Sequence, residues 1–535
     1  MPSAPLSLII AYARAGASAF AWERFAAAGF DRVTDDAAAL GVKGRLLKDR
    51  ALARQGAERR RLYAEAAAAY RSAAALNGST YPLINAATLS LLSREEAQAR
   101  DTARQVLEQI EQDPEEPETP YYRVATRAEA LLLLGREAEA RSSFSEAVAL
   151  VPQAWEDHAS TLRQLALILA EQGRDSAWLD VHRPPRSLHF GGHMSFDPKV
   201  VRREHLDEKI AAVLEEERIG FGYGALAAGA DIIIAEALLE RGAELHAVLP
   251  GGAQAFAAVS ADPFGTAWRR RFDAVLERAE TVRPVRPIHT RPDAAMIGLA
   301  DEIAMGAALM NGRRLESSAV QLLVLDSAGP GNGASGRSRE IWAAGGWRQR
   351  ILTAPRETRN DPLAAVAQAA EPLAVLAVGL TGDSALERAL ADLHALVAQL
   401  AEPAMPPYLT EDRLILAYRH PGEAADAAVR LLGAAPDALA LRIGGQYGSA
   451  DTLRDPFGGG LRIAAAGTAA AAGALASAPP GTACVTDDFA AALAAAGPRC
   501  PAAEYIGELT PPDEGPPVGL YALKSNDQLF QPVGG

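Results

Sequence analysis

The stretch GFGYGALAAGADIIIAEALLERGAELHAVLPGG, from Gly220 to Gly252, concentrates residues that could hold a ligand through the backbone. Gly220, Gly222 and Gly224 end a predicted strand and precede a predicted helix. Glycines at such a turn let backbone N–H groups approach an anion, and the helix N-terminus adds a partial positive charge. The stretch therefore predicts either a phosphate-binding mouth or a tight strand-to-helix turn, and glycine spacing alone does not separate the two.

The surrounding elements favour a ligand site. Strand-like and helix-like runs alternate over residues 186–355, which is typical of βαβ units and a Rossmann-like parallel sheet. Ligands of such sheets bind outside the carboxyl ends of the strands, where these glycines are expected. Residues 371–525 follow as a predicted ferredoxin-like α+β domain with a mixed or antiparallel sheet.

Residues 1–180 are predicted to be helical throughout. Two helices share a small–aromatic–small face, and the two faces lie about two 34-residue repeats apart. The residues are Ala66, Tyr70 and Ala73 in the first helix and Ala140, Phe144 and Ala147 in the second. This spacing predicts tetratricopeptide-like repeats, and a plain amphipathic bundle is the alternative.

Composition excludes several classes of protein. The net charge of -14 argues against a general nucleic-acid binder, because phosphate neutralisation needs excess Lys and Arg. Two cysteines in 535 residues exclude a disulfide scaffold and fit a reducing compartment. The N-terminus has no basic segment before its apolar run, and we find no membrane-spanning run, so we expect a cytoplasmic protein with no membrane partner.

The glycine stretch resembles the SLOG superfamily, a Rossmannoid group that includes DprA and the LOG nucleotide hydrolases. The shared frame is Gly-x-x-x-x-Gly-x-Asp, then a helix, then Gly, a strand and Pro-Gly. The residues that carry it are Gly224, Gly229, Asp231, Glu236, Gly242, Pro250 and Gly251. FGGHM at Phe190–Met194 resembles the family's first strand and turn, and DSAGPGNGASGRSREIWAAGG at Asp326–Gly346 resembles its second phosphate-facing loop.

The resemblance implies a nucleotide or nucleotide-like ligand. It indicates no particular cofactor. The implied contacts are Gly191, Gly192, His193, Gly222, Tyr223, Gly224, Asp231, Glu236, Pro250, Gly251, Gly331, Gly333, Ser335 and Gly336. Two of these residues have a structural alternative. Asp231 either touches a ribose or accepts backbone N–H bonds near its helix start, and His193 either contacts phosphate or has a structural role.

Catalysis at this site is not expected. LOG enzymes carry Pro-Gly-Gly-x-Gly-Thr-x-x-Glu, whereas PGNGASGRSRE keeps Pro330 and Gly331 and places Glu340 too late. We therefore expect ligand sensing, with an N-glycosidase as the alternative. Single-stranded DNA binding, the DprA-like activity, is disfavoured by the net charge, and the basic segment Trp268–Pro287 is predicted to be one solvated helix face.

The third region resembles a class III nucleotide cyclase, from PLAVLAVGLTGDSALERALADL through ALRIGGQYG to EYIGELTPPDEGPPVGLYAL. These enzymes need two aspartates for two metal ions, and an Asn and an Arg for the transition state. The aspartate positions fall on Gly379 and Asp412, and the Asn and Arg positions fall on Arg462 and Ala466. We expect a degenerate domain that binds no metal, with Asp412 as a remnant ligand, and a residual cyclase is the alternative. Such domains pair, which implies a homodimer.

The helical region resembles the TRAFs-binding domain of MAP kinase kinase kinases. GVKGRLLKDRALA at Gly41–Ala53 and AAAAYRSAAALNGSTYPLINAATLSLL at Ala66–Leu92 carry the resemblance. It implies a scaffold that binds a protein partner. The sequence therefore predicts a cytoplasmic signalling protein with helical repeats, a nucleotide-sensing SLOG-like domain and a cyclase-like domain without activity.

Overall fold

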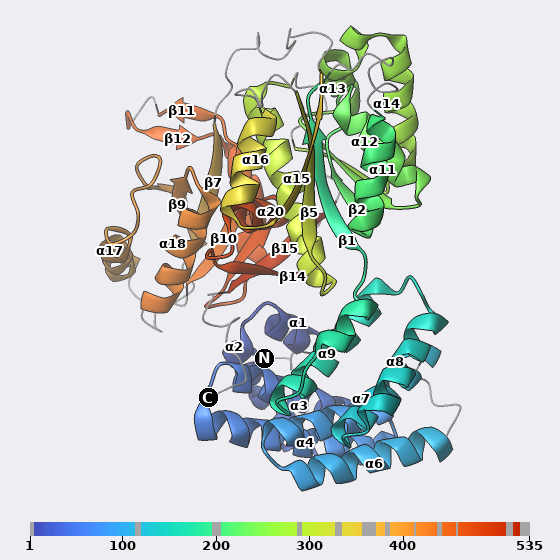
Figure 1. The fold of residues 1–535 in the computed structure, drawn as a ribbon. Helices are drawn as coiled ribbons and strands as arrows, with labels where there is room; N and C mark the ends of the chain where they lie inside the picture. The colour runs from blue at the N-terminus through green and yellow to red at the C-terminus, as the bar shows by residue number, and fades with distance from the viewer. Residues whose placement is uncertain are drawn as a thin grey trace. The chain divides into compact units, whose positions relative to one another are not determined.

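The structure is a computed structural model that describes residues 5–112, 119–194, 205–285, 292–326, 334–355, 371–379, 386–410, 413–435, 441–455, 458–509 and 517–524. It divides into two compact units, one built on Met1–Pro184 and the other formed by Pro185–Asn526. Figure 1 shows the helical unit in blue and green, and the unit with both sheets from green to red.

The first unit consists of packed helices. They are α1 (Leu6–Arg14), α2 (Ser18–Ala27), α3 (Ala37–Leu52), α4 (Gly56–Asn77), α5 (Thr80–Leu92), α6 (Glu96–Gln112), α7 (Pro120–Leu133), α8 (Glu137–Leu150) and α9 (Trp155–Glu171). The small–aromatic–small residues of α4 and α8 are all buried, which confirms the expected packing faces. Gly44 of α3 lets a neighbour approach, because a Cβ there would lie 2.7 Å from the Tyr70 ring of α4.

The second unit begins with a six-stranded sheet in the order β4-β3-β2-β1-β5-β6, in which every pairing is parallel. Its strands are β1 (Arg186–Gly192), β2 (Ile219–Gly224), β3 (Glu244–Leu249), β4 (Thr281–Pro284), β5 (Ala319–Asp326) and β6 (Arg348–Ala354). The chain adds strands outward from β1 to β4 and then returns to the other side of β1 with β5. The predicted parallel sheet is confirmed, and β1 and β5 flank its topological switch point.

Helices cover both faces of this sheet (Figure 1). They are α11 (Leu206–Glu216), α12 (Ala230–Glu240), α13 (Ala253–Ser260), α14 (Thr266–Arg278), α15 (Ala294–Arg314) and α16 (Ala334–Ala344). Helices α11 to α14 pack with the apolar face of the sheet in one core that contains Leu188, Phe190 and Leu322. The opposite face lies under α15 and α16.

A mixed seven-stranded sheet completes the unit, in the order β14-β15-β13-β10-β7-β9-β8. Its strands are β7 (Pro372–Gly379), β8 (Tyr408–Thr410), β9 (Arg413–Tyr418), β10 (Arg442–Ser449), β13 (Ala483–Thr486), β14 (Ala502–Leu509) and β15 (Val518–Lys524). The helices of this part are α17 (Leu386–Val397), α18 (Pro421–Ala434), α19 (Ala469–Ser477) and α20 (Asp487–Ala496). A separate two-stranded sheet pairs β11 (Thr452–Arg454) with β12 (Leu461–Ile463). Strands β10 and β13 run parallel, and the other neighbouring strands of the seven-stranded sheet pair antiparallel. The predicted order of helical, parallel α/β and α+β parts is therefore confirmed.

A buried carboxylate organises the amino edge of the parallel sheet. The Glu217 side chain is fully buried and pairs with Arg186 at 2.6 Å, Arg348 at 2.7 Å and Arg350 at 2.7 Å. Burial alone would raise the pKa of this carboxyl, but the hydrogen bonds from Arg348 and Arg350 outweigh it and hold the pKa below its ordinary value. The end of α11 is thereby tied to the first residues of β1 and β6.

Helix α15 lies between the two sheets. It packs against β1, β2 and β3 on one side and against α20 on the other, and the two helices approach so closely that a Cβ on Gly306 would lie 1.8 Å from the Ala491 carbonyl oxygen. By length and composition α15 could cross a membrane, but 56% of its most apolar window is buried inside the structure, and core helices pass the same test. Its apolar surface is therefore accounted for by its two packing partners.

The close approach of α15 and α20 at Gly306 predicts that alanine substitutions at two glycines of α15 change stability differently. Gly306→Ala should destabilise the second unit by at least about 3 kcal/mol, because a methyl group at that position requires α15 and α20 to separate. Gly298→Ala is the matched control, since its Cβ would meet only the end of the Arg337 side chain at 3.9 Å. It should be neutral or stabilise the helix by up to about 1 kcal/mol. Urea unfolding of the two variants measures the difference, and equal midpoints would rule out the close packing.

Candidate functional site

The predicted ligand residues gather at the carboxyl edge of the parallel sheet. Gly191 and Gly192 end β1, and Pro250 and Gly251 follow β3. Ser335 and Gly336 lie in the first turn of α16, which follows β5. Gly331 and Gly333 lie outside the described residues. The topology thus brings the end of β1, the residues after β3 and the first turn of α16 to the edge where parallel sheets bind ligands.

The glycines of β2 have a packing role. A Cβ on Gly222 would lie 2.4 Å from Leu238 Cδ1, and a Cβ on Gly224 would lie 2.7 Å from the Phe190 carbonyl oxygen. Both residues belong to the strand itself, and the following α12 begins only at Ala230. Close packing of α12 and β1 therefore accounts for glycine at both positions, and their contact with phosphate remains a prediction.

The two glycines of β1 differ from each other. A Cβ on Gly192 would lie 2.4 Å from the Val324 carbonyl oxygen and 2.5 Å from Ala230 Cβ, so packing requires glycine there. A Cβ on Gly191 would make only ordinary contact, 3.7 Å from Leu323 and 4.0 Å from Asp301 Oδ1. Packing therefore requires glycine at position 192 but not at position 191.

Asp231 is buried in the first turn of α12 and fixes the loop before it. Its Oδ2 accepts a hydrogen bond from the Ala227 N–H at 3.2 Å, and the Gly192 N–H donates to the same carboxyl. Burial raises its pKa to about 8 despite these hydrogen bonds, and the charge of Asp301 raises it further. These contacts agree with the alternative in which Asp231 accepts backbone N–H bonds near the start of its helix. A contact between Asp231 and a ribose remains a prediction.

Three other predicted site residues are engaged within the protein. The His193 ring lies 2.9 Å through Nε2 from the Ala354 carbonyl oxygen, which ties the end of β1 to the end of β6. Glu236 pairs with Arg271 of α14, and Tyr223 stacks on His246 with ring centroids 4.6 Å apart. Their side chains therefore have structural partners, and a ligand contact for each of them remains a prediction.

Polar side chains cross the whole parallel sheet in one register row, which we call the polar row. It consists of Thr281, His246, Tyr223, His189, Gln321 and Gln349, one from each strand in spatial order. It lies on the face under α15 and α16, where a core would ordinarily be apolar. Sequence analysis singled out only Tyr223 from it, because the members lie far apart along the chain and none belongs to a motif.

The centre of the polar row is a connected network. His189 is fully buried, and its Nε2 lies 3.0 Å from Asp301 Oδ1 of α15. Its Nδ1 lies 3.0 Å from Gln321 Nε2, which also donates to Ser338 Oγ at 2.9 Å. Trp342 of α16 stacks against the imidazole at 5.8 Å. Asp301 alone among these groups is partly exposed, with 24% of its side chain accessible, and it lies beside Gly191.

The structure describes three of the four positions at which the mixed sheet was compared with a cyclase, namely Gly379, Arg462 and Ala466. At Gly379 a Cβ would lie 3.1 Å from Leu475 Cδ1, so a side chain there would need that leucine to shift by a few tenths of an ångström. Arg462 pairs with Asp455 at 2.9 Å, and Asp412 lies outside the described residues. Among the residues that the structure describes, no group of three or more His, Cys, Asp or Glu side chains is arranged to hold a metal ion.

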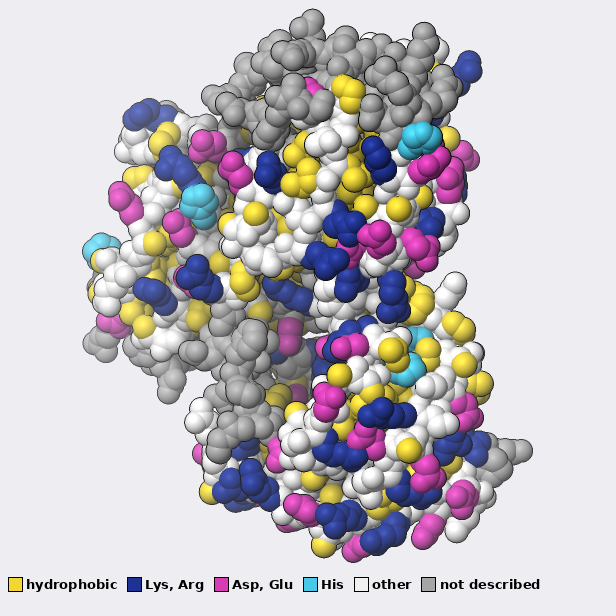
Figure 2. All heavy atoms as spheres, in the orientation of Figure 1, with side chains coloured by type: hydrophobic (Ala, Val, Ile, Leu, Met, Phe, Trp, Pro, Cys, Tyr) yellow, Lys and Arg dark blue, Asp and Glu magenta, His cyan; other side chains and the backbone are white. Residues whose placement is uncertain are grey.

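The basic segment of α14 is largely neutralised. Arg269 pairs with Asp262 at 3.2 Å and with Asp273 at 3.0 Å, and Arg271 pairs with Glu236. Figure 2 shows Lys and Arg interspersed with Asp and Glu over the face in view. These pairs leave little charge for phosphates and support the expectation that nucleic acid is not the ligand.

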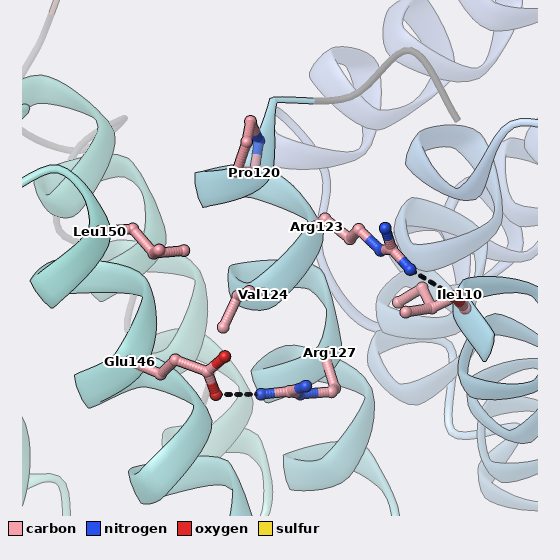
Figure 3. A pocket seen from close by; sticks show the side chains of 7 residues that line it. All are labelled: Ile110, Pro120, Arg123, Val124, Arg127, Glu146 and Leu150. Atoms are coloured by element: carbon pink, nitrogen blue, oxygen red, sulfur yellow. Dashed lines mark hydrogen bonds and ion pairs between the residues drawn. The ribbon is translucent and has the colours of Figure 1, made fainter. Parts of the chain in front are cut away.

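The helical unit has a hollow of its own, with a volume of about 330 Å³ (Figure 3). It is lined by Ile110, Pro120, Arg123, Val124, Arg127, Glu146 and Leu150. Arg127 donates to Glu146 at 2.5 Å, and Arg123 donates to the Ile110 carbonyl oxygen at 2.9 Å. Both guanidinium groups are thus held by the protein, and the hollow does not present an arginine pair to an anion.

Comparison with known proteins identifies the first part of the chain. Residues 4–90 match the family model "Tetratricopeptide Repeats-Sensor" (TPR-S). The N-terminal helices therefore form a TPR-S repeat domain, which confirms the predicted helical repeats. No curated protein matches the chain.

Several solved nucleotide cyclases match part of the chain. An adenylate cyclase from Trypanosoma brucei is 16% identical, and the match covers 30% of this chain and 92% of that one with a TM-score of 0.25. An adenylate/guanylate cyclase/hydrolase from Silicibacter pomeroyi is 18% identical over 29% and 98%, with a TM-score of 0.25. The guanylate cyclase domain of RhGC from Catenaria anguillulae, solved with GTP, is 12% identical over 30% and 99%, with a TM-score of 0.25. At this identity and TM-score the likeness says nothing about activity.

The buried Asp231 carboxyl predicts a pH-dependent stability. Its folded pKa of about 8 lies above the ordinary value near 3.9, so its protonated form stabilises the fold. That stability is fully present below pH 4 and is lost as pH rises to about 8. Asp231→Asn should therefore gain stability over the wild type, by about 1 kcal/mol or more, between pH 6 and pH 8.5.

Hydrogen exchange of the peptides that span β1 and α12, measured at both pH values, reports this difference locally. Glu236→Gln is the matched control, because its carboxylate lies on the same helix but pairs with Arg271 at the surface. It should follow the wild type at both pH values. Parallel pH profiles for Asp231→Asn and the wild type would contradict the protonated state of Asp231.

Proposed function

We propose that the chain is a cytoplasmic signalling protein whose parallel-sheet part senses a nucleotide or nucleotide-derived ligand. The proposed site is the edge of the sheet at the carboxyl ends of β1 and β5, bordered by Gly191, Gly192 and the first turn of α16. The observation that carries the proposal is the switch point itself, where the chain leaves β1 in one direction and returns on its other side with β5. The resemblance of this segment to the SLOG superfamily supports a nucleotide as the ligand.

We propose further that the mixed-sheet part does not catalyse. Three observations support a regulatory role: Gly379 has no side chain, Arg462 is held by Asp455, and Ala466 has no functional group. The cyclase-like resemblance of this region favours a homodimer formed through it. The TPR-S repeats would bind a protein partner, as their resemblance to the TRAFs-binding domain implies.

A cytoplasmic location is consistent with the cysteines. Cys484 and Cys500 are both free thiols, and Cys484 is buried within β13. Burial raises the pKa of the Cys484 thiol to about 12, so it is held as an unreactive thiol. Neither residue contributes a disulfide to the fold, as expected for a protein of a reducing compartment.

Ligand binding is tested with the full chain and a panel of AMP, GMP, CMP, UMP and ATP. At least one nucleotide should bind in isothermal titration calorimetry, and hydrogen exchange should slow in the peptides that end β1 and begin α16. Gly192→Ala, which disrupts the packing of that edge, should abolish binding. Glu240→Gln, at the exposed end of α12, should leave it intact. Binding that protects only other regions would place the site elsewhere, and no binding would overturn the proposal.

The absence of catalysis is tested on the same samples by chromatography. We expect no release of free base from the monophosphates and no cyclic nucleotide from ATP or GTP with Mg²⁺ or Mn²⁺. Turnover that disappears in Glu340→Ala would show that the protein is an N-glycosidase. Cyclic product that disappears in Asp412→Ala would show that the mixed sheet retains its activity.

A further inference from the structure

We infer that Asp301 contacts the ligand and accepts a hydrogen bond from a hydroxyl group of its ribose. The inference rests on the proposed function and names the chemical group that the proposed site recognises. Asp301 lies on α15, far along the chain from the glycine motifs, and its carboxylate comes to the end of β1 through the fold alone.

The first step of the argument is the direction of the hydrogen bonds in the network. A carboxylate only accepts hydrogen bonds, so the His189 Nε2 that lies 3.0 Å from Asp301 Oδ1 must carry the proton. In the neutral ring Nδ1 is then an acceptor, and Gln321 Nε2 supplies its donor at 3.0 Å. The Gln321 carbonyl oxygen accepts in turn from Gln349 Nε2. One continuous series of hydrogen bonds, from Gln349 through Gln321 and His189, therefore donates toward Asp301.

The second step is what this direction does to Asp301. The buried groups behind it are satisfied by one another, and Trp342 holds the imidazole from its face. One carboxylate oxygen is thus fixed by a buried donor, while the side chain keeps 24% of its surface accessible. Within the described part of the chain no second hydrogen bond to Asp301 is formed. Such a carboxylate is pre-organised to accept one more donor from outside the protein.

The third step is its position at this edge of the sheet. Asp301 Oδ1, the oxygen beside His189, lies 4.0 Å from the place that a Gly191 Cβ would occupy, so the carboxylate lies next to glycine at the end of β1. Packing does not require glycine at 191, in contrast to 192. Gly191 and the fixed acceptor therefore coincide at the topological switch point.

The fourth step concerns the chemistry of the group that Asp301 can hold. A carboxylate repels phosphate and attracts hydroxyl and amino donors. A nucleotide offers its ribose hydroxyls as a rigid pair of such donors. A phosphate, in contrast, would need the backbone N–H groups and helix N-termini along the same edge. Asp301 would thus orient the ligand with its ribose beside α15 and its phosphate away from that helix.

The test compares ribonucleotides with their deoxy forms. Whichever of AMP, GMP, CMP or UMP binds the full chain is titrated by calorimetry against its 2′-deoxy and 3′-deoxy forms. The wild type should bind the ribonucleotide at least about 10-fold more tightly than one deoxy form, as expected for a hydrogen bond to a charged group. Asp301→Asn should lose most of this preference by weakening ribonucleotide binding.

Glu302→Gln is the matched control. It removes the neighbouring carboxyl of the same helix, which faces the other way and accepts from the Tyr447 hydroxyl at 3.2 Å. This variant should keep the wild-type preference. If Asp301→Asn does not fold, Gly191→Ala tests the same contact, because its methyl group fits the fold and lies beside the carboxylate. It too should lose the preference.

The outcomes separate this inference from the proposed function. If a nucleotide binds and both Asp301→Asn and Gly191→Ala keep the wild-type preference, the inference is wrong and the proposed site stands. If the preference shifts equally in Glu302→Gln, the effect is a general one on α15, and the inference is again wrong. If no nucleotide of the panel binds the wild type, the proposed function is wrong and the inference is overturned with it.

Discussion

The second unit depends on a helix that has to pack on two sides at once. Helix α15 lies against β1, β2 and β3 of the parallel sheet and against α20 of the mixed-sheet part, and at Gly306 the two helix backbones are in contact. A helix in that position has almost no surface at which a polar side chain can simply face water. Each of its polar groups must therefore meet a partner, because an unsatisfied buried group costs more than a hydrogen bond returns.

The polar residues of α15 satisfy this condition in both directions. Asn311 donates to Ser187 of β1 at 3.0 Å, and Asp301 accepts from His189 of the same strand. Glu302 turns toward the mixed sheet and accepts from the Tyr447 hydroxyl of β10. Burial raises the pKa of Glu302 to about 7, although Arg337 and that hydroxyl favour its charged form. Asp301 and Glu302, which are adjacent on α15, thus contact the parallel sheet and the mixed sheet respectively.

This double packing explains what sequence analysis could and could not predict. The parallel sheet over residues 186–355 was predicted because short apolar runs between turn signals indicate buried strands. The helices of the first unit were predicted from periodic faces such as the one that contains Tyr70. Helix α15 was not predicted, because a helix buried on two sides has no polar face and therefore no amphipathic period. Its Asp293 cap, which accepts from the Met296 N–H at 2.9 Å, was the one local signal.

The candidate site shows the same limit. The glycine motif led to the carboxyl edge of the sheet, because glycines after strands mark carboxyl ends in any βαβ fold. It did not distinguish a glycine required by packing, such as Gly222 against Leu238, from one that leaves space, such as Gly191. That distinction depends on which atoms of other elements lie opposite each residue. The polar row was equally hidden, since its six members become neighbours only through the strand register.

Two aspartates determine the electrostatics of this edge of the sheet. The end of β1 lies between Asp231 on the α12 face and Asp301 on the α15 face, and the charge of Asp301 raises the pKa of Asp231. Asp231 relieves this repulsion by remaining protonated around neutral pH, while Asp301 receives the donor that crosses the sheet through His189. A ligand with hydroxyl donors near α15 adds to that arrangement, whereas an anion in the same place opposes it. The backbone N–H groups of the edge suit a phosphate, and the Asp301 carboxylate suits hydroxyl donors. A nucleotide carries both, with its phosphate and its ribose hydroxyls at different ends.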